Sequence, residues 1–128
     1  MRVRRKLVSN IKPLRQEIGI TQEQLAEIIG VSRQTISYLE KGEYNPSLKI
    51  AHDIAKYFEK SIDDIFSYEP IITIKRKQFN LTQDQLATLL GINVDDLKKL
   101  EIDEYQGGME LIEKVARQLD CKVEDLIE

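Results

Sequence analysis

Five side chains that donate or accept hydrogen bonds occur within six positions in the first half of the chain. They are Arg33, Gln34, Thr35, Ser37 and Tyr38. Guanidinium, amide and hydroxyl groups are suited to non-covalent recognition of polar partners rather than to bond making or breaking. A single apolar residue, Ile36, interrupts them, and a second, Leu39, follows at helical spacing. The pattern predicts a helix with one polar and one apolar side.

Groups that catalysis or metal binding would need are missing from the sequence. The only histidine, His52, has no second histidine to join it, and Cys121 is the only cysteine. No Cys/His metal spacing, phosphate-cradling glycine loop or nucleophile–base constellation is present. We therefore expect no enzymatic activity, no cofactor and no metal.

The elements that must hold these side chains are two short helices joined by the turn Gly30-Val31-Ser32. Thr21, followed three positions later by Gln24, predicts a capping box at the first helix. The apolar stripe of that helix comprises Leu25, Ile28 and Ile29. Gly30 is suited to end it, because the chain needs a left-handed residue there. A helix-turn-helix is predicted.

The second helix begins after Ser32 and should end at Gly42. Ala26 is small and lets the two helices cross closely, while Ile36 and Leu39 anchor the second one from below. The five hydrogen-bonding side chains then lie on the outer face. In motifs of this kind the second helix enters the major groove of DNA.

Three further helices are predicted in the same half of the chain. The first lies near Ser9–Ile18, the fourth begins after Ser47, and a short fifth begins after Ser61. No strand is expected apart from a weak alternation over Val3–Val8, and Pro70 marks a short linker. The fold class is therefore all-α.

The sequence contains the same unit twice. Residues 11–66 align with residues 72–127 without a gap, with 14 identities in 56 pairs. Most other apolar positions exchange like for like. The chain is therefore expected to contain two tandem five-helix domains, over residues 1–67 and 68–128.

The stretch TQEQLAEIIGVSRQTISYLEKGEYNPSL resembles the phage repressor and Cro-like family of regulators, also called the Xre family. The resemblance covers residues 11–66. It rests on the Gln-Leu-Ala triplet, the Gly-Val-Ser turn, the Ile-Ser-x-Leu-Glu run and the Asn-Pro-Ser segment. It implies lambda-repressor-like five-helix domains that bind double-stranded DNA sequence-specifically, usually as a homodimer on a palindrome.

The same resemblance implies roles for individual residues. Gln22 would hold a phosphate, and Arg33 and Gln34 would reach base edges, since arginine suits guanine and glutamine suits adenine. Further base or backbone contacts would come from Thr35, Ser37, Tyr38, Lys41 and Asn45. Tyr38 has the alternative of covering the edge of the core. A buried ion pair would join Arg15 to Glu40 and recur as Arg76 with Glu101.

The outer face of the second copy differs from the first. Arg33-Gln34-Thr35 becomes Val94-Asp95-Asp96, which adds carboxylates that phosphates would repel, although Ser37-Tyr38 becomes Lys98-Lys99. Residues 1–67 carry a net charge of +2 and residues 68–128 carry −5. We interpret the second copy as a domain that has stopped reading bases and that serves dimerisation or binds another protein.

Other features of the sequence indicate the compartment. A lone cysteine suits a reducing environment, and Cys121 is expected in an exposed loop. No apolar run approaches the ~18–20 residues needed to cross a membrane. The basic start, Arg2 to Lys6, is either a DNA-binding arm or a solubilising tail and is no signal peptide. We expect a cytoplasmic protein.

Three functions are consistent with the sequence. The favoured one is a dimeric transcriptional regulator, with repression as the favoured mode, that reads DNA through the first copy. The second is a monomeric tandem reader in which both copies bind DNA. The third is a protein-interaction adaptor or antitoxin that uses the same fold.

Overall fold

The computed structural model describes residues 2–128, which fall into two compact units. The first unit comprises Leu7–Tyr68, and the second comprises residues 2–6 together with Glu69–Glu128. The sequence predicts one domain over residues 1–67. The residues 2–6 instead pack within the second unit.

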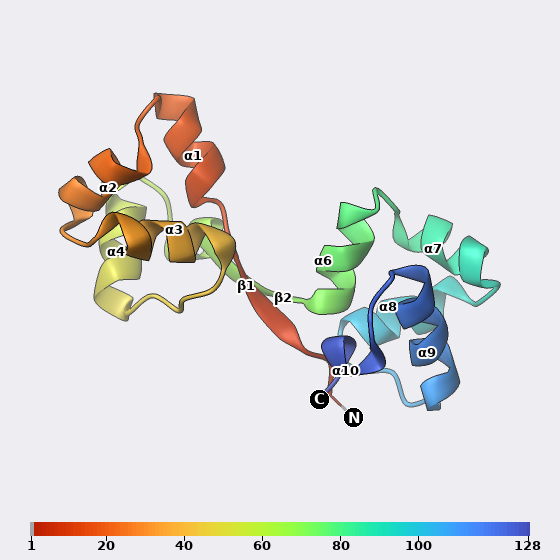
Figure 1. Cartoon of the computed structure of the whole chain (residues 1–128). Helices are drawn as coiled ribbons and strands as arrows, with labels where there is room; N and C mark the ends of the chain where they lie inside the picture. Colours follow the sequence, from red (N-terminus) through yellow and green to blue (C-terminus); the bar gives the residue numbers. More distant parts are fainter. Residues whose placement is uncertain (1) are drawn as a thin grey trace. The chain divides into compact units, whose positions relative to one another are not determined.

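The first unit contains five short helices (Figure 1). They are α1 (Ile11–Ile18), α2 (Gln22–Ile29), α3 (Arg33–Lys41), α4 (Leu48–Tyr57) and α5 (Ile62–Ile65). Their apolar faces enclose one core, in which Ile11, Leu25 and Ile54 are fully buried.

The second unit repeats this order of helices. They are α6 (Ile71–Gln78), α7 (Gln83–Leu90), α8 (Val94–Glu101), α9 (Met109–Gln118) and α10 (Val123–Leu126). Ile72, Leu86 and Val115 occupy the positions of Ile11, Leu25 and Ile54 and are equally buried. The predicted pair of five-helix domains is confirmed.

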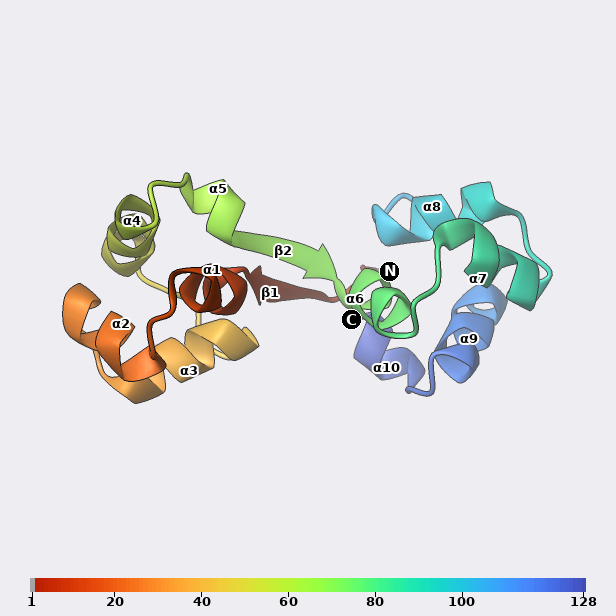
Figure 2. The ribbon, with the colours of Figure 1, turned by 90° about the horizontal axis from the view of Figure 1, so that it is seen from above.

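Two strands accompany the helices. β1 (Arg5–Ser9) pairs with β2 (Phe66–Pro70), and Figures 1 and 2 show the two side by side. The predicted linker around Pro70 is therefore a strand, and the basic start is neither a free arm nor a free tail. The two strands are about 60 positions apart in the sequence, so no local sequence pattern predicts their pairing.

The start of the chain is part of the second unit. Val3 is 3% exposed and forms an antiparallel bridge with Ile127. The Arg4 N–H donates to the Leu126 carbonyl and the Arg4 carbonyl accepts from the Ile71 N–H, each at 2.8 Å. Both backbone groups of Arg4 are thus bonded inside the second unit. Residues 2–4 therefore belong to this unit through an isolated bridge and backbone hydrogen bonds.

Replacing Val3 with aspartate should destabilise the second unit selectively. The change removes an apolar side chain whose burial contributes roughly 1.5–3 kcal/mol to stability, and it places a carboxylate in an apolar environment. Hydrogen exchange should become faster at the amides of Ile112 and Leu119, which lie in the second core. Replacing the exposed Arg2 with alanine is the matched control. Unchanged exchange in the Val3 variant would show that residues 2–4 are dispensable.

Two remaining expectations concern the thiol and membranes. Cys121 is half-buried rather than exposed, and burial raises its pKa above the ordinary value. Each helix within residues 2–128 is too short or too polar to cross a lipid bilayer.

Candidate nucleic-acid interface

Local sequence determines the turn between α2 and α3. Thr21 and Gln24 form the complete capping box, in which each side chain accepts from the other residue's backbone N–H. Gly30 ends α2 with a φ of 85°, a conformation that disfavours residues with a Cβ. Ser32 caps α3 by accepting from the Thr35 N–H at 3.1 Å. These predicted features are confirmed.

Three buried residues set the orientation of α3. Ile36 and Leu39 are fully buried on its inner side, and Ala26 of α2 is 3% exposed where the two helices meet. Because successive residues of a helix are rotated by about 100°, this inner side forces the predicted residues outward. The outer side of α3 is therefore the candidate recognition surface.

The side chains on this surface differ in solvent exposure and in hydrogen bonding. Arg33 and Gln34 are exposed, Tyr38 is 39% exposed, and Thr35 and Ser37 are half-buried. Gln34 Nε2 donates to Tyr38 Oη at 2.8 Å. The guanidinium of Arg33 makes no hydrogen bond or ion pair with residues 2–128. It is free for the bidentate contact that arginine makes with guanine.

The Thr35 hydroxyl is already engaged at the start of the helix. It lies 2.9 Å from the Ser32 hydroxyl, which also caps α3. The Tyr38 hydroxyl is turned to Gln34 on the exposed side, while the rest of this 39% exposed side chain is covered by its neighbours. Of the five predicted side chains, Arg33, Gln34 and Tyr38 are the most accessible.

Gln22 belongs to a polar network that joins three helices. Its Nε2 donates to Glu40 Oε1 at 3.1 Å, and Arg15 Nε donates to Glu40 Oε2 at 2.8 Å. The bond to Glu40 raises the pKa of Arg15 above its already high ordinary value. The network ties the start of α2 to the end of α3. It holds Gln22 in place and leaves its second amide hydrogen unused.

The predicted backbone-contact residues flank the loop after α3. Lys41 is the last residue of α3 and Asn45 lies in the loop, and both are exposed. Asn45 Oδ1 accepts a hydrogen bond from Tyr68 Oη at 2.8 Å. Tyr68, on β2, was not predicted to lie near the site. It is 23 positions away, and no sequence signal links the two residues.

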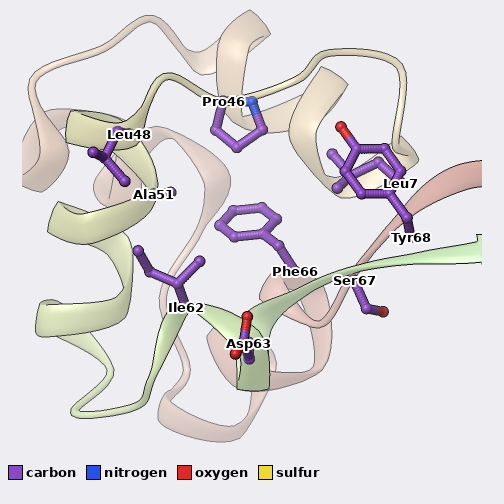
Figure 3. Close-up of a pocket in the computed structure, with 9 residues that line it drawn as sticks. All are labelled: Leu7, Pro46, Leu48, Ala51, Ile62, Asp63, Phe66, Ser67 and Tyr68. Atoms are coloured by element: carbon purple, nitrogen blue, oxygen red, sulfur yellow. The ribbon is translucent and has the colours of Figure 1, made fainter.

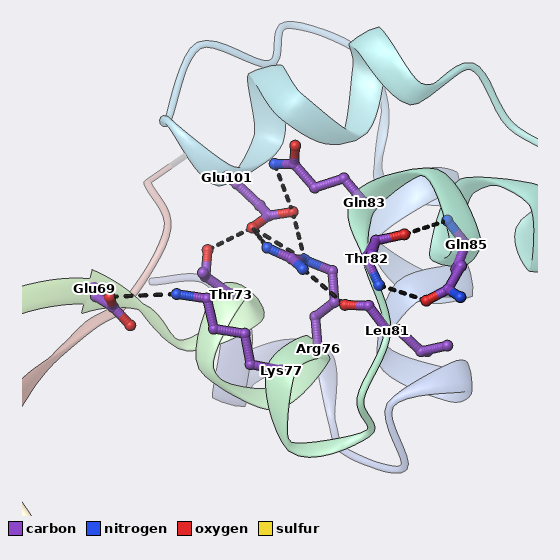
Figure 4. A network of polar contacts seen from close by, with 9 residues as sticks. All are labelled: Glu69, Thr73, Arg76, Lys77, Leu81, Thr82, Gln83, Gln85 and Glu101. Carbon is purple, nitrogen blue, oxygen red and sulfur yellow. Dashed lines mark hydrogen bonds and ion pairs between the residues drawn. The ribbon is translucent and has the colours of Figure 1, made fainter.

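The second unit keeps the network and changes the outer face. Arg76 and Glu101 are 8% and 5% exposed, and Gln83 Nε2 donates to Glu101 Oε2 at 3.2 Å. Thr73 Oγ1 adds a bond to Glu101 Oε1 at 2.6 Å, which has no counterpart in the first unit because the equivalent residue is Lys12. Figure 4 shows these side chains converging on Glu101.

On α8 the first turn carries Asp95 and Asp96, both exposed, followed by the exposed Lys98 and Lys99. The two carboxylates stand where a helix N-terminus favours negative charge. They therefore stabilise α8 itself while presenting an acidic surface where the first unit presents Gln34 and Thr35, and Val94 replaces Arg33.

The charge difference inferred from the two halves does not describe the two units. The first unit has 7 basic and 9 acidic residues, a net charge of −2. The second has 12 basic and 13 acidic residues, a net charge of −1, because residues 2–6 bring four basic side chains. Net charge therefore does not distinguish the two units, whereas the residues on the outer faces of α3 and α8 do differ.

Comparison with known proteins gives two matches to one family model. The model described as helix-turn-helix matches residues 11–65 and again residues 72–126. The two matches correspond to the two sets of five helices.

Individual relatives include regulators from archaea and a phage. An uncharacterized HTH-type transcriptional regulator of Archaeoglobus fulgidus is 51% identical over 61 residues, which is 48% of this chain and 86% of that protein. One of Methanocaldococcus jannaschii is 54% identical over 61 residues, 48% of this chain and 92% of that protein. The immunity repressor protein of Bacillus phage phi105 is 28% identical over 119 residues, covering 84% of this chain and 83% of the repressor.

Proposed function

Because this chain belongs to the helix-turn-helix family of DNA-binding transcription regulators, we propose that its first unit reads base edges through α3. The main support is that the Arg33 guanidinium, at the start of that helix, has no hydrogen-bond or ion-pair partner within residues 2–128. It lies beside the exposed Gln34. Arginine contacts guanine O6 and N7, and glutamine contacts adenine N6 and N7. Gln22, Lys41 and Asn45 hold the DNA backbone on either side, with support from Thr35, Ser37 and Tyr38.

The proposed regulator acts as a homodimer on a two-fold symmetric site and represses transcription. One helix-turn-helix unit makes few contacts, whereas specific affinities of about 10⁻⁸–10⁻¹¹ M generally need larger interfaces. Two recognition helices on one face of DNA would contact half-sites about 34 Å apart. The likeness to a phage immunity repressor supports repression as the mode.

The proposed role of the second unit is dimerisation or the binding of another protein. Asp95 and Asp96 support this role because carboxylates at the start of a recognition helix repel phosphates. Since the net charges of the two units are nearly equal, the proposal that the second unit does not read DNA rests on these two residues alone.

Replacing Asp95 and Asp96 with alanine should leave operator affinity unchanged or raise it. No favourable DNA contact would be lost, and two repulsive charges would be removed. The binding constant should be measured at a fixed near-physiological salt concentration, since phosphate contacts depend on salt. Circular dichroism should accompany it because the two carboxylates also stabilise α8. A clear loss of affinity by a folded variant would show that the second unit contacts DNA.

Selection of bound sequences from a random duplex library tests the proposed function as a whole. A two-fold symmetric site with half-sites about one helical turn apart is the expected result. Absence of any enriched sequence would contradict base reading and favour the adaptor interpretation.

A monomeric tandem reader is the second candidate. Lys98 and Lys99 favour it, as does the intact network of Gln83, Arg76 and Glu101 in the second unit. Selection would then give an asymmetric site with two unrelated halves. Sedimentation of the complex would find one chain on each operator rather than two.

A further inference from the structure

A pocket of about 460 Å³ opens on the first unit, apart from the outer face of α3 (Figure 3). It is lined by Leu7, Pro46, Leu48, Ala51, Ile62, Asp63, Phe66, Ser67 and Tyr68. These residues come from both strands, the loop before α4, the first half of α4 and the start of α5. The volume is within the range of about 300–1,000 Å³ that is typical of small-molecule sites.

A small residue, Ala51, makes room for this pocket. It is 5% exposed and lies on α4. The equivalent residue of the second unit is Ile112, which is fully buried in that unit's core. The same fold therefore accommodates a side chain with three more carbon atoms at this position. A pocket at this position is therefore not a requirement of the fold.

The lining combines apolar walls with one charged group. Figure 3 shows the carboxylate of Asp63 at the rim, near Ile62 and Phe66. Asp63 is exposed and takes part in no side-chain hydrogen bond or ion pair with residues 2–128. An occupant complementary to these groups has an apolar body and a positive charge at one end.

We propose that this pocket binds a small amphipathic amine whose apolar body contacts Ala51, Phe66 and Leu48 and whose ammonium group pairs with Asp63. Leu48 is 80% exposed and would be covered by the bound molecule. Apolar contact supplies most of the affinity, and the carboxylate selects the sign of the charge.

The pocket is linked to the DNA-binding loop by one hydrogen bond. Tyr68 forms part of the wall, and its hydroxyl donates to Asn45 Oδ1 at 2.8 Å. Pro46, the residue after Asn45, lines the pocket directly. A molecule that packs against the Tyr68 ring moves the hydroxyl away from Asn45 and releases the loop. Occupancy therefore lowers operator affinity, an inference that rests on the proposed function.

The binding test uses three probes with a common apolar group: 4-phenylbutylamine, 4-phenylbutanol and 4-phenylbutyrate. Each is titrated into the full chain, and the amide signals of Ala51 and Ser67 are followed by nuclear magnetic resonance. The amine should bind best and the carboxylate worst. Equal binding of all three probes, or no binding of the amine, would overturn the proposal.

Two variants locate the site. Ala51→Ile, which copies the residue of the second unit, should abolish binding of the amine and the alcohol. Asp63→Asn changes an exposed side chain and leaves the walls intact. It should weaken amine binding about two- to five-fold, as expected for an exposed charge pair, without affecting the alcohol. Amine binding that survives both variants would place the site elsewhere.

The regulatory step is tested separately from binding. Saturating 4-phenylbutylamine should weaken operator binding by the natural chain, whereas Tyr68→Phe should still bind the amine and show no further change. If the amine binds but operator affinity never changes, the regulatory inference is wrong. If no operator is found at all, the proposed function fails while amine binding stands. A variant Ala51→Ile that alters the sedimenting mass, with no amine bound by the natural chain, would identify an interface between copies and overturn the proposal.

Discussion

Replacing Arg33 with alanine should weaken operator binding by roughly 5- to 150-fold, since loss of a bidentate contact with guanine costs about 1–3 kcal/mol. Preference for one base pair of each half-site should relax at the same time. The reason is geometric: Arg33 lies at the exposed start of α3, and its guanidinium has no partner within residues 2–128. Titration of the natural operator and of single-base variants would measure both effects.

The control for Arg33 must remove the same charge elsewhere in the first unit. Lys56→Ala is suitable because Lys56 is exposed near the end of α4 and lies outside the proposed interface. It should change affinity only slightly and equally for all operator variants. Equal effects of the two substitutions would show that Arg33 contributes general charge and reads no base.

Replacing Glu101 with alanine should destabilise the second unit by about 3–5 kcal/mol, the usual cost of leaving a buried charge without its partner. Arg76 would lose both carboxylate oxygens while its side chain remains 10% exposed. Thr73 and Gln83 would each lose the same acceptor. A domain of this size has only roughly 3–10 kcal/mol of stability. Denaturation followed by circular dichroism should show the second unit unfolding at a much lower denaturant concentration than in the natural chain.

Glu104→Ala provides the matched control for Glu101. Glu104 is exposed in the loop after α8, so its removal changes net charge equally and leaves no buried group unpaired. It should alter the free energy of unfolding by less than about 0.5 kcal/mol. A cost below about 1 kcal/mol for Glu101→Ala would show that water replaces the carboxylate and that the network is not essential for folding.

The helices and their ends were predictable because their causes are local. Thr21, Ser32, Ser47 and Ser61 each accept from the backbone N–H three residues later, as their positions before apolar stripes indicate. The internal repeat then extended the same prediction to the second unit. Buried positions such as Ile36 and Leu39 followed from helical spacing alone.

The predicted ion pairs also formed, in both units, with Gln22 and Gln83 as further members. The resemblance to repressors implied the pairs, but the direct bond from each glutamine to the glutamate was not predicted. An amide on the first turn of a helix can turn either to solvent or to a neighbouring helix, and only the packing of α1, α2 and α3 selects between them.

The sequence by itself determined ten helices, two cores and the outer faces of α3 and α8, since each follows from residues a few positions apart. Tertiary structure decided that residues 2–6 complete the second unit, that Tyr68 reaches Asn45, and that Ala51 leaves a pocket open. These features join segments up to about 120 residues apart, and backbone hydrogen bonds in a strand carry no side-chain signature. The physical reason is range: helical periodicity is a property of neighbours, whereas strand pairing and cavities depend on which distant segments meet.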